Sequence, residues 1–255
     1  MQDFAEGLRI WRQRRRLSQL GLSVEAAVSA RHIAFLETGR ARPSRGMVLR
    51  LAEALAVPRG GRNALLAAAG FAPHYPDLGL DAAEMARVRA AMDWTIRRHA
   101  PYPAVVMDRL WRLVALNAPA ARLFGALGLG EGASLLAALS RPEVRAAIEN
   151  WAEVGHHVLE RLRAESARAG GVAELDAAAT ALARDPAVAA REPPARPAVV
   201  VPTVYRADGL RLSLFSTYAQ FGTAEDAGLA DLKIELMFPA DAGTEATLRA
   251  IDGPA

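Results

Sequence analysis

The stretch SARHIAFLETGRARPS, residues 29–44, decides the fold of the first part of the chain. Ser29 can cap the start of a helix with its hydroxyl, and Gly39 stands where a left-handed residue would end that helix. At about 100° per residue, Ile33 and Leu36 point together into a core. The sequence therefore predicts a short, well-delimited helix whose other face carries Arg31, Ala34 and Phe35.

Four further short helices are predicted around this one. The first has an apolar face formed at helical spacing by Phe4, Leu8 and Trp11. The second follows Ser18, a candidate N-cap, and its apolar contacts are expected from Leu20, Leu22 and Val24. The remaining two begin after Pro43 and at Pro58. Five short helices within residues 1–71 indicate a compact all-α domain.

Basic residues concentrate in this domain. Residues 1–75 contain 12 arginines and 5 acidic residues, a balance of +7, whereas residues 76–255 contain 19 basic and 23 acidic residues, a balance of −4. The two balances sum to the net charge of +3. A basic first third beside an acidic remainder indicates a polyanionic partner, although an arginine-rich genome would also produce part of this bias.

After residue 71 the pattern becomes mixed. Residues 72–100 are expected to form a polar, proline-bearing linker and a connecting helix over 81–100. Residues 104–117 are typical of two strands joined by a turn at Asp108-Arg109. Asn117 would cap the helix that follows.

The rest of the chain combines helices with further strands. A long helix is predicted over residues 141–170, and a loop passes through Pro193-Pro194. Three strands are expected in PAVVVPTVYR, LRLSLFSTYAQF and LKIELMF, with a hairpin turn at Asp208-Gly209 between the first two. Residues 101–255 are therefore predicted to form an α+β domain with an antiparallel sheet of about five strands.

The first domain resembles a known DNA-binding motif. Residues 17–44, LSQLGLSVEAAVSARHIAFLETGRARPS, are similar to the helix-turn-helix of the Xre (lambda-repressor-like) family, whose pattern reads S-Q, then S-x-x-x-I-x-x-L-E-x-G, then P-S. The resemblance covers residues 4–71. It implies that Gln19 contacts the DNA backbone and that the base-reading positions are Ala30, Arg31 and Phe35.

The chemistry of these residues agrees with such a role. Arg31 offers a bidentate donor pair to guanine, and Phe35 can touch a thymine methyl unless it belongs to the core. Arg40 and Arg42 can bind phosphates, or they are solvated surface residues. The complete set of expected DNA contacts is Gln19, Ser29, Ala30, Arg31, Phe35, Arg40, Arg42 and Ser44.

The same resemblance bears on stability. An arginine at the position of Arg12 pairs in the family with a glutamate at the position of Glu37, which would join the first helix to the third. The family usually has glycine in the corner where this chain has Ala27, and a left-handed alanine costs roughly 1 kcal/mol relative to glycine. Gly21 and Gly60-Gly61 lower local stability further, so we expect a marginally stable domain.

The remainder of the chain resembles one subgroup of this family, in which an MmyB-like ligand-binding domain of PAS-like fold follows the DNA-binding domain. The similarity lies in RLAEALAV (50–57), RNALLAAAGFAP (62–73), VVMDRLWRLVALNAPAARLFG (105–125), ENW (149–151) and LFSTYAQFGTAEDAGLADLKIELMFPAD (214–241). This resemblance implies a fatty-acid-like ligand.

A small apolar ligand needs a cavity, and the aromatic residues of the second domain are candidates to line one. For each of them a well-filled core is the alternative. The candidate set is Trp111, Asn150, Trp151, Tyr205, Phe215, Tyr218 and Phe221.

Several kinds of function find no support. The chain has no cysteine, which excludes disulfides, thiolate zinc sites and cysteine nucleophiles. His156 and Glu160 have a metal-binding spacing but no second pair, so no metal or cofactor is expected. No nucleophile elbow or glycine-rich phosphate loop indicates an enzyme. A run of about 18 apolar residues is absent and the N-terminus lacks a signal-peptide core, so we expect no membrane partner and a cytoplasmic location.

The sequence thus predicts a ligand-responsive transcriptional regulator. It would bind a double-stranded DNA operator as a homodimer, and its PAS-like domain would sense a small apolar molecule. The alternative is that the second domain binds no ligand and serves only for dimerisation or protein interaction.

Overall fold

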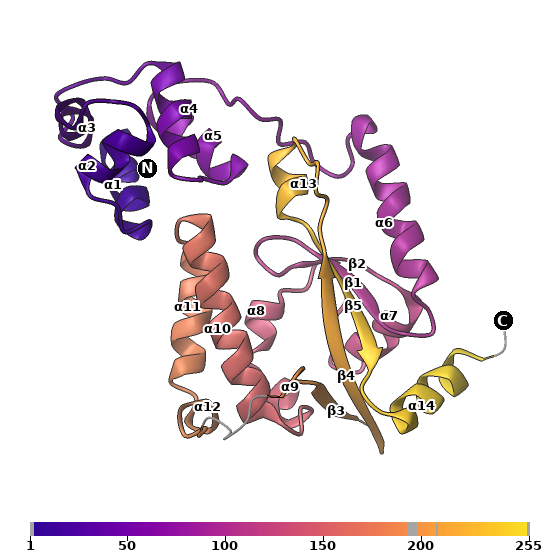
Figure 1. Cartoon of the computed structure of the whole chain (residues 1–255). Helices are drawn as coiled ribbons and strands as arrows, with labels where there is room; N and C mark the ends of the chain where they lie inside the picture. Colours follow the sequence, from indigo (N-terminus) through magenta and orange to yellow (C-terminus); the bar gives the residue numbers. More distant parts are fainter. Residues whose placement is uncertain (1–2, 193–197, 208, 254–255) are drawn as a thin grey trace. The chain divides into compact units, whose positions relative to one another are not determined.

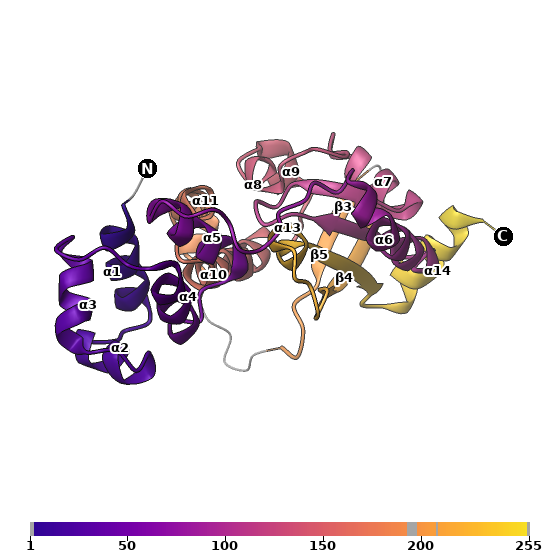
Figure 2. The same cartoon turned by 90° about the horizontal axis from the view of Figure 1, so that it is seen from above.

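A computed structural model describes residues 3–192, 198–207 and 209–253. The chain divides into two compact units, which are shown in Figures 1 and 2. Unit 1 contains Met1–Leu78 with the short segments Glu165–Val172 and Thr223–Ala230. Unit 2 contains Gly79–Ala164, Ala173–Gly222 and Asp231–Ala255.

Five helices form the N-terminal part of unit 1. They are α1 (Phe4–Arg14), α2 (Gln19–Glu25), α3 (Ala30–Glu37), α4 (Arg45–Ala54) and α5 (Arg59–Ala68). The first four each begin after a residue whose side-chain oxygen accepts a hydrogen bond from a backbone N–H in the first turn. These caps are Asp3, Ser18, Ser29 and Ser44. The five-helix all-α prediction is confirmed.

One apolar core lies between these helices. Its fully buried members include Leu8, Leu22, Ile33, Leu36 and Leu51. The prediction that Leu20 and Val24 also pack inward is wrong, because their side chains are 67% and 74% exposed. They stand four residues apart on one side of the short helix α2, and Leu22 lies on the other side.

The tight turns of the domain have the expected backbone. Ala27, in the corner between α2 and α3, has φ of 49°, and Gly39 at the end of α3 has φ of 70°. A further glycine is required for packing. A Cβ at Gly61 would stand 2.8 Å from Cγ1 of Val57 and 3.0 Å from Cζ2 of Trp11. Glycine therefore lets α5 approach the Trp11 ring closely.

Unit 2 is built on one antiparallel sheet with strand order β2-β1-β5-β4-β3. The strands are β1 (Ala104–Met107), β2 (Leu113–Leu116), β3 (Thr203–Ala207), β4 (Leu210–Ala219) and β5 (Lys233–Pro239). This confirms the predicted α+β architecture, a PAS-like domain with a five-stranded antiparallel sheet.

Helices flank and connect these strands. They are η1 (Ala83–Met85), α6 (Ala86–Arg98), α7 (Ala118–Gly125), α8 (Leu135–Ala138), α9 (Pro142–Ala146), α10 (Trp151–Ala169), α11 (Ala173–Ala183), α12 (Pro186–Ala189), α13 (Ala227–Asp231) and α14 (Ala242–Asp252). Asn117 caps α7 by accepting from the N–H of Ala120, as expected. The helices α8, α12, α13 and α14 were not expected from the sequence.

The two faces of the sheet have different neighbours. On one face, Phe238 lies edge-on to His99 at the end of α6. In the plane of the sheet, Ser213 N–H donates to Oγ1 of Thr244 in α14 (2.9 Å). Figure 1 shows α6 on one side of the sheet and α10 on the other. Phe215 stacks on Phe238, and side chains alternate along β4, so Leu214 and Ser216 point away from α6.

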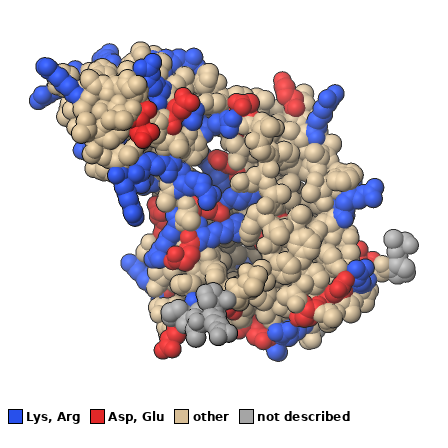
Figure 3. All heavy atoms as spheres, in the orientation of Figure 1, with Lys and Arg blue, Asp and Glu red and all other residues tan. Residues whose placement is uncertain are grey.

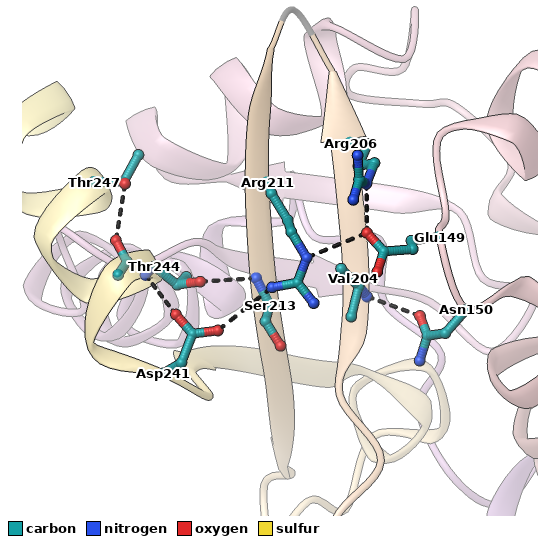
Figure 4. A network of polar contacts seen from close by, with 10 residues as sticks. Glu149, Asn150, Val204, Arg206, Arg211, Ser213, Asp241, Thr244 and Thr247 are labelled. Carbon is teal, nitrogen blue, oxygen red and sulfur yellow. Dashed lines mark hydrogen bonds and ion pairs between the residues drawn. The ribbon is translucent and has the colours of Figure 1, made fainter.

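The predicted long helix over residues 141–170 is two helices, and this prediction is wrong. The chain between α9 and α10 pairs with the edge of β3: Glu149 N–H donates to Val204 O and Arg206 N–H to Ala147 O, both at 2.8 Å. Asn150 continues this pairing with its side chain, which donates to Pro202 O (2.8 Å) and accepts from Val204 N–H (3.0 Å; Figure 4). Hydrogen bonds to a strand edge therefore replace about one turn of helix.

Two predicted loop features fall partly outside the described residues. The Pro193-Pro194 loop lies wholly outside them, and so does Asp208 of the hairpin turn. The partners that flank this turn, Ala207 and Leu210, are paired, and Gly209 has φ of 78°. The predicted hairpin between β3 and β4 is present. No helix in the described part of the chain has the length and apolar character to cross a membrane.

Candidate nucleic-acid interface and ligand cavity

The outer face of α3 carries an arginine stacked on an aromatic ring. Ser29 caps this helix by accepting from the N–H of His32 (3.2 Å), while Ile33 and Leu36 are completely buried. Arg31 is exposed, and its guanidinium carbon lies 5.3 Å from the ring centroid of half-buried Phe35. Phe35 therefore lies at the surface beside Arg31, outside the core formed by the opposite stripe.

The loop after α3 places two more arginines at the surface. Arg40 and Arg42 are both exposed, and Ser44 closes the loop by capping α4, accepting from the N–H of Met47 (3.2 Å). Ala30, the first residue of α3, is half-buried. Figure 3 shows basic side chains projecting from the part of the molecule that α1–α5 form. Most of the expected DNA contacts thus stand on α3 and the segment that follows it.

A buried ion pair between α1 and α3 holds the end of the helix that carries Arg31. Arg12 in α1 binds Glu37 at the end of α3 through Nε–Oε1 (2.6 Å) and Nη2–Oε2 (2.8 Å), and the two side chains are 12% and 3% exposed. Arg12 Nη1 also donates to Leu17 O (2.9 Å). This confirms the expected pair between the first and third helices. Such a bidentate geometry fixes the orientation of both side chains.

Gln19 belongs to the same cluster. Its amide nitrogen donates to Oε2 of Glu37 (2.9 Å), so the residue expected against the DNA backbone also holds the end of α3. Burial alone would raise the pKa of Glu37, but hydrogen bonds from Arg12 and Gln19 outweigh it and lower the pKa. The carboxylate therefore stays ionised beneath the surface that carries Arg31.

Unit 2 contains a cavity of about 470 Å³ on the face of the sheet away from α6. Its walls come from β1, α7, α8, α10, β3, β4 and β5. Most of the lining is aliphatic or aromatic, including Met107, Phe124, Leu135, Ile148, Val154, Leu214 and Met237. A cavity of this size and character is typical of sites that bind small organic molecules.

Four of the seven candidate pocket residues line this cavity: Trp111, Trp151, Tyr205 and Tyr218. The other three lie elsewhere. Asn150 faces the edge of β3, and Phe215 stacks on Phe238 (centroids 5.6 Å apart) on the opposite face of the sheet. Phe221 follows the end of β4 and is not part of the lining. Alternation along β4 explains the separation of Phe215 from Tyr218, because odd and even positions face opposite sides.

A charged group stands at one end of the cavity. The guanidinium carbon of Arg161 lies 4.3 Å from the ring centroid of Trp111 and 3.9 Å from that of Tyr218. Arg161 also donates to the hydroxyl of Tyr218, which in turn donates to Oε1 of Glu235 (2.9 Å). Two aromatic faces and a hydroxyl thus orient this cation where it lines the cavity.

Arg161 and Glu235 were missed in the sequence, although a signal exists for the arginine. Trp151, Val154, Val158 and Arg161 recur at helical spacing along α10, and all four line the cavity. An arginine that ends such an apolar stripe is unusual enough to single out. Glu235 gave no comparable signal, because it belongs to the alternation of charged and apolar residues in LKIEL (232–236).

The turn between β1 and β2 delivers Trp111 to this end of the cavity. Oδ1 of Asp108 accepts from the N–H groups of Leu110 (2.8 Å) and Arg112 (2.9 Å), which curls the chain tightly. Trp111 then adopts φ of 57°, a left-handed conformation that is strained for a bulky residue. Such strain is concentrated in functional sites. The predicted turn at Asp108-Arg109 therefore also positions a cavity residue.

The histidines of α10 do not stand in a metal centre. His157 lines the cavity and lies edge-on to His156, with ring centroids 6.0 Å apart. Within the described ranges, no group of three or more histidine and acidic residues is arranged to hold a metal ion.

Comparisons with known proteins agree with a helix-turn-helix part followed by a ligand-binding part. The model of the MmyB-like transcription regulator ligand binding domain matches residues 88–251, more than half of the chain, and the model of a helix-turn-helix domain matches residues 3–65. Neither model describes an enzyme. No curated protein matches the chain.

Among solved structures, a match is found to the one titled "Structure of an RNA-binding Light-Oxygen-Voltage Receptor", with 15% sequence identity and a TM-score of 0.28. The alignment covers 97% of this chain and 62% of that receptor chain.

Proposed function

The chain belongs to the family of MmyB-like transcription regulators, and we propose that it is a one-component regulator that binds operator DNA and responds to a small ligand. Residues 1–71 would bind DNA, and residues 101–255 would bind the ligand. Residues 72–100, a linker followed by a helix, would connect these two domains. The observation that carries the proposal is the stacking of exposed Arg31 on half-buried Phe35, on a capped helix and opposite the buried Ile33–Leu36 stripe.

In the DNA-binding part, α3 would enter the major groove with its N-terminal turn foremost. Arg31 would donate to O6 and N7 of a guanine, and Phe35 would contact a thymine methyl. Arg40 and Arg42 would bind phosphates and so position the helix without reading sequence. Gln19, Ser29, Ala30 and Ser44 would complete the contacts. Selection of bound sites from random-sequence DNA by the full chain tests this part.

In the ligand-binding part, the proposed ligand has an apolar body and an anionic head, like a fatty acid. The apolar walls of the cavity favour burial of a hydrocarbon chain, which is worth about 0.8 kcal/mol for each methylene. Arg161 would bind the head group, because a guanidinium matches the geometry of a carboxylate. Mass spectrometry of small molecules extracted from the purified full chain tests whether such a ligand is bound.

The second hypothesis, a ligand-free interaction module, is less well supported. A cavity filled by the protein's own side chains would favour it. Instead, about 470 Å³ of space lies between named side chains of β1, β4 and α10. The sensor function accounts for this space, and the module does not.

Regulation would require two copies of the chain. A single helix-turn-helix domain reads only a half-site, so we propose a homodimer joined through unit 2. The outer face of α6 is the proposed contact, since Trp94 is 62% exposed there and Ala86 and Ala90 precede it at four-residue spacing. Ligand binding would favour one arrangement of the two DNA-binding domains and thereby change the affinity for the operator.

A further inference from the structure

We propose that Tyr205 divides a continuous ligand channel into two compartments and thereby limits the length of the hydrocarbon chain that the protein accepts. This inference rests on the proposed function, because it concerns the same ligand. It adds a second binding compartment and a residue that determines specificity.

The second compartment is a separate cavity of about 340 Å³ in unit 2. Its lining is almost entirely apolar and includes Leu123, Ala126, Leu210, Leu212, Leu248 and Ile251. Two of these side chains, Leu210 and Ile251, are 45% and 42% exposed. Apolar surface of this kind gains stability when a hydrocarbon covers it.

The two cavities follow the same elements. Along one face of β4, Leu210 and Leu212 line the second cavity, and Leu214, Ser216 and Tyr218 line the first. Helix α7 also contributes to both, with Leu123 in the second cavity. A chain that enters beside Arg161, at the Tyr218 end of β4, would therefore run toward the second cavity.

Tyr205 stands between them and lines both. It is the cross-strand partner of Leu212, the last β4 residue on the second-cavity side, and its hydroxyl hydrogen-bonds with Thr203 of the first cavity. Burial raises the pKa of this hydroxyl, and the nearby Glu235 carboxylate adds to the effect, so the side chain stays neutral. A neutral, buried ring in this position is a wall that an apolar chain can contact but cannot pass.

The far wall of the second compartment is tied together. Arg122 of α7 pairs with Asp252 at the end of α14, with Nη2–Oδ1 at 2.6 Å. These are the two helices that supply Leu123 and Leu248. Opening the route past Tyr205 would therefore join two preformed compartments rather than create a new one.

The test measures how chain length affects binding in the full-length protein. Dodecanoate and octadecanoate are titrated by calorimetry into the wild type and into Tyr205→Val, which suits a strand but lacks the ring. Tyr205→Phe keeps the ring and is the matched control. Tyr205→Ala provides a second opening variant if Tyr205→Val does not fold, as judged by circular dichroism.

The wild type should prefer dodecanoate. The opening variant should bind octadecanoate at least about tenfold more tightly than the wild type does, since each buried methylene contributes roughly fourfold in affinity. Tyr205→Phe should keep the wild-type preference. Adding Leu210→Trp to the opening variant, which fills the second cavity from its exposed rim, should abolish the gain.

An unchanged preference in a folded opening variant overturns the inference, and so does a gain that survives Leu210→Trp. Both results leave the proposed function standing, because dodecanoate still binds. If the wild type binds neither carboxylate, the proposed function fails and the inference fails with it.

Discussion

Arg12 and Glu37 join the first helix to the end of α3 through two hydrogen bonds of 2.6 and 2.8 Å, and both side chains are almost fully removed from solvent. Gln19 adds a third hydrogen bond from α2. Three helices therefore meet at one carboxylate, directly behind the face that carries Arg31. The orientation of the proposed recognition helix depends on this cluster.

Glu37→Gln should weaken this junction. Removing one charge of a buried pair leaves the other uncompensated, so we expect a loss of about 3 kcal/mol in the free energy of opening of α3. Hydrogen exchange of the α3 amides in the full chain measures it. The matched control is Glu25→Gln, because Glu25 is exposed and should change this free energy by less than about 0.5 kcal/mol. Equal protection of α3 in the two variants would contradict the assignment.

The pairing of Glu37 with Arg12 also determines how the stability of α3 depends on pH. The folded protein lowers the pKa of Glu37 below its ordinary value of 4.5, so its ionised form contributes stability at higher pH. That contribution should be lost as pH falls from 4.5 through the lowered pKa of the folded state. In Glu37→Gln this part of the acid sensitivity of α3 should be missing. If the stability of α3 falls with pH in the same way in the wild type and in Glu37→Gln, Glu37 does not cause this acid sensitivity.

Arg42→Ala should affect all DNA equally. If Arg42 binds a phosphate, its loss weakens binding to operator and random DNA alike and flattens the dependence of log K on log salt by about one phosphate. Fluorescence anisotropy across a series of salt concentrations measures this slope. Arg184→Ala removes an exposed arginine of unit 2 and should leave the slope unchanged. A wild-type slope in Arg42→Ala would remove Arg42 from the phosphate contacts.

Arg161→Ala should discriminate between ligand head groups. Hydrogen bonds to a charged partner contribute about 2 kcal/mol, so affinity for dodecanoate should fall by roughly thirtyfold. Binding of dodecanol should change far less, because it carries no charge. Comparing the acid with the alcohol in the same variant separates head-group binding from a general disturbance of the cavity. Equal losses for both would assign Arg161 a structural role only.

Trp94→Glu should dissociate the proposed homodimer. A carboxylate in the centre of an apolar helix contact must be buried without a partner, which opposes association. Analytical ultracentrifugation of the full chain at micromolar concentration distinguishes dimer from monomer. Arg184→Glu changes charge at an exposed position of unit 2 outside α6 and is the control. A strictly monomeric wild type would contradict the dimer altogether.

Features that depend on residues close in sequence were predicted better than features that depend on pairing between distant segments. The Ser29 cap, the Ile33–Leu36 stripe and the left-handed Ala27 depend on neighbours in sequence, and all three are confirmed. The break between α9 and α10 could not be predicted in this way. It arises because Glu149 and Asn150 bond to β3, more than fifty residues later in the chain.

The cavity shows the same limit. Aromatic composition singled out Tyr205 and Tyr218, which line the cavity, but it could not place Phe215 on the opposite face without the register of β4. Arg161 was missed because composition favours apolar residues, whereas its place is set by rings from two other elements. Sequence patterns report what a segment prefers, and the tertiary contacts decide which residues meet.

The central claim is that this chain reads bases through α3, and Arg31 tests it most directly. Its side chain lies opposite the buried stripe, so Arg31→Ala should leave the fold intact. Full-length wild type and variant are each allowed to select sites from random-sequence DNA. The wild type should enrich one sequence, and Arg31→Ala should lose preference at a single base pair and bind the wild-type site about 1–3 kcal/mol more weakly, with a much smaller loss on random DNA. Enrichment of the same base at every position by both proteins, or of no sequence by the wild type, would contradict the claim.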